Sequence, residues 1–299
     1  MRCYQAGLIA AAFTAAALGA PRPRPAAPAN FSGKSALAFT QAVVSLGPRP
    51  PGSRPHGGTE LYIESQIKLH HAELIEDSFT AQTPNGSMHM KNIIAKFGGS
   101  TGRAVVFTGH YDTKFMPGRG FLGANDGGSS TGFLLEMLRV LATRKYPDDI
   151  FLVWFDGEEA FREWSATDSL YGSRHLAERW SNDGTASRIK ALINVDMIGD
   201  KDLGILQEGN SSRSLMKLVW QTARDIGYGK YFLDTGFATE DDHIPFVRQG
   251  VNALDLIDFD YGPNNAYWHT PQDTMDKLSA HSLQVVGDVL LAVLGKLEE

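Results

Sequence analysis

The segment IFLVWFDGEE, residues Ile150–Glu159, joins an apolar run to two adjacent carboxylates. The run Ile150–Phe155 is short and rich in β-branched and aromatic residues, which is typical of a buried strand. Because neighbouring residues of a turning segment point in different directions, Glu159 can bind a metal while Glu158 faces the reacting atoms, or the reverse. An isolated Glu-Glu pair is more often a solvated acidic turn, so this interpretation depends on the rest of the chain.

More metal-ligand side chains fall at or just beyond the ends of other predicted strands. They are His110, Asp126, Asp196 and His269. Amphipathic patterns between these strands predict helices, for example over Ser129–Arg144 and Ser211–Ile226. Strands that alternate with helices predict a three-layer α/β/α sandwich with a central mixed, mostly parallel sheet. Sites in such sheets form beyond the carboxyl ends of the strands.

The remaining predicted elements follow the same alternation. Helices are expected at Ser35–Leu46, Thr59–Leu74, Tyr171–Arg179 and Leu283–Leu297. Strands are expected at Asp77–Thr83, Lys91–Phe97, Arg103–Thr108, Ile189–Met197 and Ala253–Ile257. Pro84-Asn85-Gly86 is a strong turn signal, and Pro48–His56 is expected to be a loop.

Length and composition indicate one globular domain. The 299 residues are 42% hydrophobic and 21% charged, so the chain can bury a large core. We expect a single domain over residues 35–299, and a monomer. A net charge of −6 gives no electrostatic support for nucleic acid as a partner, and favours a peptide or a small molecule.

The N-terminus has the pattern of a signal peptide. Arg2 precedes the apolar, Ala-rich stretch Ala6–Leu18, which is too short for a comfortable membrane span. We therefore expect a signal peptide over residues 1–20, a flexible lead-in over residues 21–34, and export to the periplasm or the medium. The one cysteine of the chain, Cys3, lies within the expected signal peptide, so the mature protein would have no disulfide. Because the short apolar stretch would be removed as well, we expect no stable membrane span in the mature protein.

Five short sequences with candidate metal ligands occur along the chain. They are GHYDT at 109–113, GAND at 123–126, GEE at 157–159, NVDM at 194–197 and WHT at 268–270. Histidines and carboxylates spread over separate loops are typical of a catalytic zinc site with one open coordination position. Together the five sequences resemble the zinc-dependent aminopeptidase superfamily, although each alone would be weak evidence.

Three longer stretches are more specific. They are residues 156–176, which contain an aromatic insertion, EDDHIPF at 240–246, and YWHT at 267–270. These stretches resemble the glutaminyl cyclases, enzymes that convert an N-terminal glutaminyl residue to pyroglutamate and release ammonia. The resemblance covers nearly all of the expected mature chain. It implies that the substrates are peptides or proteins with an N-terminal glutamine.

The resemblance also implies a zinc site and a proton-transfer residue. Asp126, Glu159 and His269 would bind one zinc ion per chain, and Glu158 would transfer protons. Zinc would polarise the γ-carboxamide, the α-amine would attack it intramolecularly, and no protein nucleophile would be required. Glu158 would then need a raised pKa in order to accept a proton from the amine and give it to the departing ammonia.

Four further residues have implied roles around Glu158. Asp241 and Asp196 would be its hydrogen-bonded acidic support, and at least one of these carboxyls would retain a proton. Trp164 and Trp268 would form the glutamine pocket, although tryptophans are more commonly core residues. These roles follow from the resemblance alone.

Three positions leave alternatives open. His110 can be a ligand of a second metal, or a neighbour that supports the first ligands. Lys114 can line the entrance or be solvated. Asp255 stands where mammalian-type cyclases have a histidine with a supporting role, which puts the electrostatics of the pocket in doubt more than the reaction.

Two rival functions remain at this point. In a two-zinc aminopeptidase, His110 and Asp196 would bind a second metal, Asp126 would bridge, and Glu158 would activate water. The insertion at Phe161–Ser169 favours a small terminal glutamine over open peptide cleavage. A non-catalytic binding domain would be expected to lack metal ligands, yet every ligand type is present.

Overall fold

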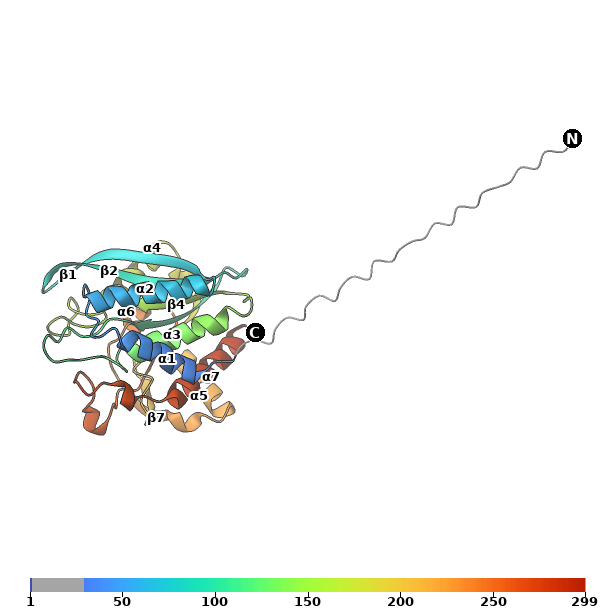
Figure 1. Ribbon diagram of the computed structural model, residues 1–299. Coiled ribbons are helices and arrows are strands. Elements are labelled where there is room, and N and C mark those ends of the chain that lie inside the picture. Colours follow the sequence, from blue (N-terminus) through green and yellow to red (C-terminus); the bar gives the residue numbers. More distant parts are fainter. Residues whose placement is uncertain (2–29, 299) are drawn as a thin grey trace.

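The structure is a computed structural model that describes Met1 and residues 30–298. The predicted signal peptide, apart from Met1, and residues 21–29 of the predicted lead-in lie outside the described residues. Figure 1 shows the order of the helices and strands along the chain.

A six-stranded sheet forms the centre of the fold, with the order β1-β2-β4-β3-β5-β8. Its strands are β1 (Glu73–Thr83), β2 (Gly86–Phe97), β3 (Ala104–His110), β4 (Asp149–Phe155), β5 (Ile189–Asp196) and β8 (Ala253–Ile257). Strands β4, β3, β5 and β8 pair in parallel, whereas β1 and β2 form an antiparallel hairpin with β2 against β4. The predicted Pro84-Asn85-Gly86 turn closes that hairpin, where Thr83 pairs with Gly86. The expected mixed sheet is confirmed.

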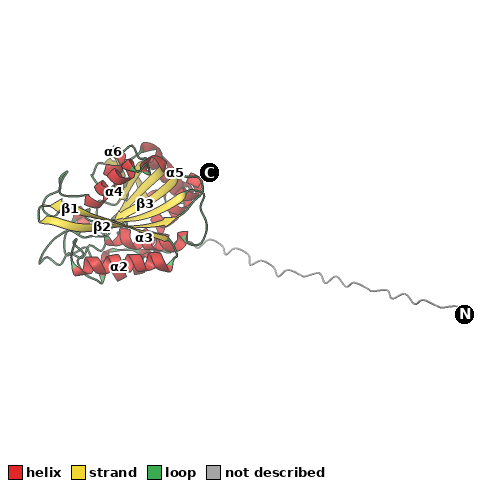
Figure 2. Ribbon diagram, turned by 90° about the horizontal axis from the view of Figure 1, so that it is seen from above, coloured by secondary structure: helices red, strands yellow, loops and turns green. Residues whose placement is uncertain are grey.

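Helices cover both faces of the sheet. One face packs against α1 (Gly33–Val44), α2 (Arg54–Leu69), α3 (Gly128–Leu141), α5 (Arg213–Asp225) and α7 (Ala280–Glu298). The other face packs against α4 (Tyr171–Asn182) and α6 (His243–Arg248). Figure 2 shows α2 and α3 on one side of the strands and α4 and α6 on the other. The predicted three-layer α/β/α sandwich is therefore confirmed.

Helix α2 begins earlier than the sequence pattern predicts. The Ser53 side chain accepts a hydrogen bond from the His56 backbone N–H, and Pro55 occupies the first turn. The prediction that Pro48–His56 is entirely loop is thus wrong at its last three residues. The helix ends at Leu69, because His71 has a positive φ of 56°.

Three short elements have no counterpart in the sequence prediction. They are α6 and the strands β6 (Ile205–Glu208) and β7 (Phe232–Phe237), which pair with each other. Each has six residues or fewer, so it is too short to show a clear period. Helix α6 matters for the site because it follows the Asp241-Asp242 pair.

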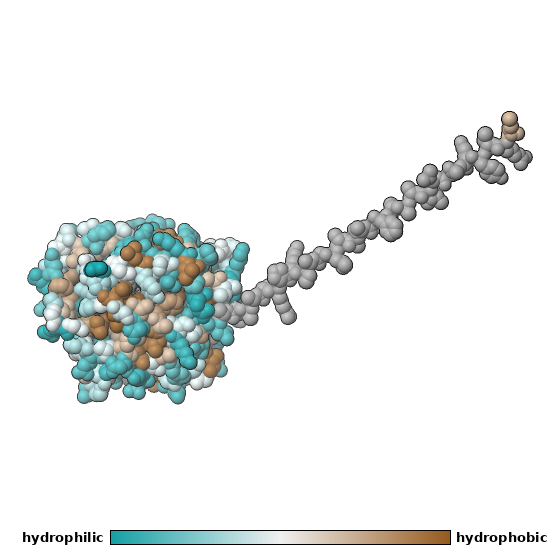
Figure 3. Space-filling view, in the orientation of Figure 1, coloured by the Kyte–Doolittle hydropathy of each residue, from teal (hydrophilic) through white to brown (hydrophobic). Residues whose placement is uncertain are grey.

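The surface is mixed in character. Figure 3 shows hydrophobic residues among hydrophilic ones on the face that carries α1 and α2. Within residues 30–298, α7 is the helix that is long and apolar enough to cross a membrane. Half of its apolar window is buried, and its Leu283, Leu290 and Val293 belong to the main core. The packing of α7 is therefore that of a core helix.

Candidate active site

The parallel strands bring the predicted site residues to one edge of the sheet. Strand β3 ends at His110, β4 ends one residue before Asp156, and β5 ends at Asp196. A cavity of about 340 Å³ opens at this edge. Of the predicted site residues, all except His110 line this cavity: Asp126, Glu158, Glu159, Trp164, Asp196, Asp241, Trp268 and His269. The other lining residues are Lys114, Thr239, Glu240, Ile257 and Phe259.

Asp126, Glu159 and His269 form a group with the donor set of a zinc site. Nε2 of His269 lies 3.0 Å from Oε1 of Glu159 and 3.2 Å from Oδ2 of Asp126. Ligand atoms of the three residues lie within 4.8 Å of one another. Oδ2 of Asp126 is buried and has no hydrogen-bond donor within residues 30–298. One nitrogen and two carboxylates fit a three-residue catalytic zinc site.

The charges of this group suit a cation. Burial opposes ionisation, but the neighbouring imidazoles of His110 and His269 hold the pKa of Asp126 well below its ordinary value. Burial also opposes protonation of His269, whose pKa is nevertheless raised to about 10 by Glu159 and Asp126. A metal that binds here would displace that proton and neutralise the carboxylates.

His110 lies between Asp126 and Asp196. Its Nε2 is 3.3 Å from Oδ1 of Asp126 and 3.2 Å from Oδ1 of Asp196. These three side chains form a second group that could hold a metal, and all three are buried. The geometry therefore keeps both sequence interpretations of His110: a second metal ligand, or a hydrogen-bonding neighbour of Asp126.

Glu158 is a buried carboxyl beside the cavity. Burial, together with the charges of Glu159 and Asp241, raises the pKa of Glu158 well above its ordinary value. Burial likewise raises the pKa of Asp196 to about 7. These groups can hold protons near neutral pH, as general acid–base chemistry requires. The hydrogen-bond partner of Asp196 in residues 30–298 is His110, so the link of Asp196 to Asp241 is electrostatic.

Asp112 fixes the turn that carries the two glutamates, a role that the sequence prediction missed. Its side chain accepts hydrogen bonds from the backbone N–H groups of Glu158, at 3.1 Å, and Glu159, at 3.4 Å. Gly157 begins this turn with a φ of 65°, and a Cβ there would lie 2.8 Å from Sδ of Met90. Asp112 lies within GHYDT, but nothing in the sequence says which backbone it would bind.

Asp273 fixes the loop that carries Asp126 and was also missed. Its carboxylate accepts hydrogen bonds from the backbone N–H groups of Asn125 at 2.8 Å and Asp126 at 3.2 Å. The Tyr261 hydroxyl donates to the same carboxylate at 2.8 Å. The hydrogen bonds from Asn125 and Asp126 to Asp273 therefore join the segment after His269 to the loop before α3.

Aromatic side chains form the walls of the cavity. Trp268 stacks on His269 with ring centroids 4.0 Å apart, and Phe259 packs on Trp268 at 5.0 Å. Trp164 remains 41% exposed at the cavity, as expected of a pocket residue rather than a core residue. Lys114 lies at the cavity, with Nζ 3.3 Å from Oε2 of Glu159. Phe259 was missed because no motif contains it.

Asp255 lies behind the cavity, in β8. Asn194 donates a hydrogen bond to its Oδ1 at 3.0 Å, and Nδ1 of His243 is 4.0 Å from its Oδ2. Burial and the charges of Asp241 and Asp196 raise the pKa of Asp255 well above its ordinary value. His243 also pairs with the buried Glu208, with Nε2 3.0 Å from Oε2 of that carboxylate.

Comparisons with known proteins agree with this geometry. The family model "Peptidase family M28" matches residues 92–294. A glutaminyl-peptide cyclotransferase of Drosophila melanogaster is 34% identical over 254 residues, which cover 76% of this chain and 70% of the relative. The structure is also similar to the crystal structure of an Acidobacteriales bacterium glutaminyl cyclase, with a TM-score of 0.88 and 43% identity over 94% of this chain and 99% of the other.

A peptidase with the same fold is also similar. A Zn-dependent exopeptidase from Parabacteroides distasonis has a TM-score of 0.80 and 26% identity, over 90% of this chain and 99% of the other. Both the matched family model and the sequence relatives span most of the chain. The chain therefore belongs to peptidase family M28 and, within it, to the glutaminyl cyclases.

Proposed function

We propose that the chain is a zinc-dependent glutaminyl-peptide cyclotransferase, which converts the N-terminal glutaminyl residues of peptides to pyroglutamate and releases ammonia. The observation that carries this proposal is the buried Glu158, whose pKa is raised by burial and by the charges of Glu159 and Asp241, beside a cavity walled by Trp164, Trp268 and Phe259. The relatives and structures that bear this name span most of the chain.

Zinc fits the group of Asp126, Glu159 and His269, and we assign one ion per chain to these three residues. When bound, it would polarise the carbonyl of the substrate's γ-carboxamide and stabilise negative charge on that oxygen. Lys114, 3.3 Å from Glu159, would help to hold the Glu159 carboxylate in place. The remaining chemistry belongs to side chains of the protein.

Glu158 is the proton-transfer residue of this proposal. The substrate's α-nitrogen forms a bond to the γ-carbonyl carbon, and the bond from that carbon to the amide nitrogen breaks. Glu158 accepts the proton lost by the α-nitrogen and donates it to the leaving nitrogen, which departs as ammonia. Because the nucleophile belongs to the same residue as its target, the attack is intramolecular and needs no activated water.

Asp241 and Asp196 are the acidic neighbours that this proposal assigns to the support of Glu158, and both line the same cavity. The charge of Asp241 raises the pKa of Glu158 beyond the effect of burial, which favours the protonated form that ammonia release requires. Trp164 and Trp268 would hold the aliphatic part of the glutamine side chain and exclude water. Trp164 is partly exposed at the cavity, so the peptide beyond its first residue would extend past this side chain into solvent.

The pattern of the first residues supports a proposal about where the enzyme acts. We propose that it is exported by a signal peptide at residues 1–20 and acts as a monomer on peptides or proteins in the periplasm or the medium.

A two-zinc aminopeptidase is the second candidate, because His110, Asp126 and Asp196 form a second possible metal group. One assay separates the two functions. The protein, without its signal peptide, is incubated with a Gln-initiated peptide and with a Leu-anilide, and ammonia and free arylamine are followed side by side. We expect ammonia and no arylamine. Arylamine without ammonia would establish the aminopeptidase instead.

A further inference from the structure

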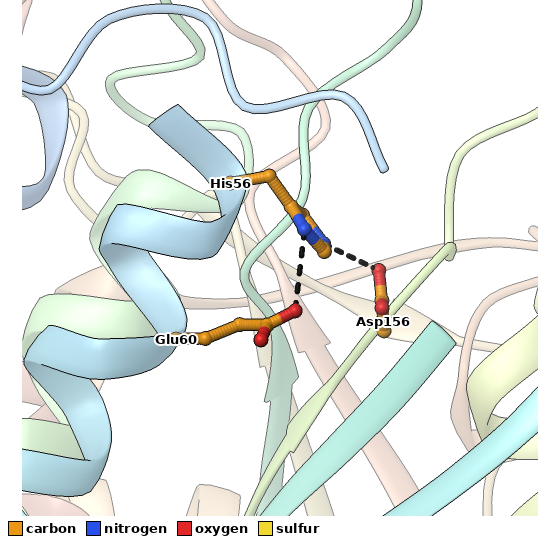
Figure 4. A group of neighbouring side chains, drawn as sticks. All are labelled: His56, Glu60 and Asp156. Carbon is orange, nitrogen blue, oxygen red and sulfur yellow. Dashed lines mark hydrogen bonds and ion pairs between the residues drawn. The ribbon is translucent and has the colours of Figure 1, made fainter. Parts of the chain in front are cut away.

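A buried histidine, His56, lies between two carboxylates, one of which directly precedes the turn Gly157–Glu159. Nε2 of His56 is 2.8 Å from Oδ1 of Asp156, and its Nδ1 is 3.3 Å from Oε1 of Glu60 (Figure 4). His56 and Glu60 come from α2, whereas Asp156 directly follows β4. The ring stacks on Tyr111 at 5.0 Å. His56 does not line the cavity, and no role in the reaction described above uses it.

These three side chains have the composition of a metal site but not its arrangement. Each ring nitrogen already faces a different carboxylate, so no single nitrogen is free for a cation. Nζ of Lys91 lies 2.9 Å from Oε2 of Glu60 and supplies a positive charge there. Burial opposes protonation of the imidazole, but Asp156 and Glu60 raise the pKa of His56 above its ordinary value. A protonated His56 therefore donates a hydrogen bond to Asp156 and forms an ion pair with Glu60.

Asp156 is the residue through which this histidine reaches the active site. Its Oδ2 accepts the backbone N–H of Lys91 at 2.8 Å, while its own N–H donates to Oδ1 of Asn92 at 3.1 Å. Gly157 and then Glu158 and Glu159 follow in sequence. The orientation of Asp156 thus sets where this turn begins.

We propose that His56 is a positioning residue which, through its Nε2 bond to Asp156, fixes the turn that carries Glu158 and Glu159. The inference rests on the proposed function, since it assigns His56 to the same site. Its ion pair with Glu60 orients the ring on α2, and its hydrogen bond to Asp156 transmits that orientation to the turn.

Two conservative variants distinguish the contact of His56 with Asp156 from its contact with Glu60. In His56→Gln the side-chain NH₂ reaches the position of Nε2 and can still donate to Asp156, whereas in His56→Asn it reaches the position of Nδ1 and can donate only to Glu60. Glu64→Gln is the control, because Glu64 also pairs with Lys91, at 2.6 Å, but has no contact with His56. The kcat, KM, zinc affinity and melting temperature of each variant are measured, with activity at saturating zinc.

We expect kcat to fall about tenfold or more in His56→Asn, with KM changed by less than about twofold. His56→Gln should recover most of that loss, and Glu64→Gln should match the wild type. Equal kcat in the Asn and Gln variants would overturn the proposal, because the bond to Asp156 would then not matter. Loss of melting temperature without a difference in kcat between them would overturn it as well.

Failure of the proposed function gives a different result. If the wild-type protein does not cyclise glutaminyl peptides, zinc affinity still tests His56, because Glu159 belongs to the same turn. His56→Asn should then bind zinc about tenfold more weakly than His56→Gln. Equal zinc affinities would reject the positioning role.

Discussion

Nε2 of His110 lies 3.2 Å from Oδ1 of Asp196, so the imidazole and the carboxyl group form a hydrogen bond with each other. Burial raises the pKa of Asp196 to about 7, and a carboxyl that retains its proton is a poor metal ligand. Asp126, in contrast, is held in its ionised form. The two possible metal groups therefore differ in how readily their carboxylates bind a cation.

We predict about one tightly bound zinc per chain, held by Asp126, Glu159 and His269. Elemental analysis of dialysed, active protein checks this number. His110→Ala should retain that zinc, whereas His269→Ala should lose it. Two equivalents of zinc together with cleavage of a Leu-anilide would favour the two-zinc aminopeptidase.

Glu158→Gln tests proton transfer separately from metal binding. The amide keeps the size of the side chain but cannot carry a proton, so kcat should fall by roughly 10²–10⁴ while the zinc content stays near that of the wild type. Glu159→Gln is the matched control, and should instead weaken zinc binding. A loss of zinc from Glu158→Gln would contradict the role assigned to Glu158.

The rate of cyclisation should rise with pH between roughly pH 6 and pH 8. The attacking α-amine must be neutral, and its ordinary pKa is about 7.7–8.0. Burial also raises the pKa of Glu158. The ionised form of Glu158, which accepts the proton, therefore becomes populated at higher pH than the ionised form of an ordinary glutamate. A flat profile of kcat/KM across this interval would rule out attack by the free amine.

Asp258 should make the protein less stable as the pH rises. Burial raises its pKa to about 7, whereas an aspartate in the unfolded chain has a pKa of about 3.9. Between these values the folded state binds more protons, so this contribution to stability is fully present below about pH 4 and is lost as the pH approaches 7.

The variant Asp258→Asn removes this ionisation. Relative to the wild type, its free energy of unfolding should improve by on the order of 2–3 kcal/mol between pH 5 and pH 8. Denaturant unfolding at both pH values measures the change. Asp260→Asn is the control, because Asp260 is exposed and two positions away. An equal change in both variants would show that burial of Asp258 is not the cause.

The sequence predicts the layers of the fold because the buried strands and amphipathic helices are long. Ile150–Phe155 and Ala253–Ile257 are strands in the structure, the second with the bounds that its pattern predicts. The ends of helices are harder to predict from hydrophobic patterns, because an end depends on one capping residue. The Ser53 cap places the start of α2 at Arg54, although Pro48–His56 has the composition of a loop.

Most of the residues that the motifs identify line one cavity, but the residues that hold them in place do not show in the sequence. Asp112 and Asp273 each act on the backbone of another loop, and a side-chain type does not reveal a partner that is distant in sequence. His56 is a similar case, because its partner Asp156 is 100 positions away. Nothing about residue 56 alone distinguishes a loop histidine from one that contacts a strand end.

The bond between Asp273 and the loop at Asn125–Asp126 also has a consequence for biosynthesis. The two ends of this contact are 147 and 148 positions apart, so the loop carrying Asp126 gains its anchor only after nearly the whole chain has been synthesised. His269 is added at the same late stage. A chain that is still emerging lacks one member of the group that fits zinc until residue 269 has been added. Zinc binding by all three residues therefore follows synthesis of the larger part of the sheet and of both loops that carry the carboxylates.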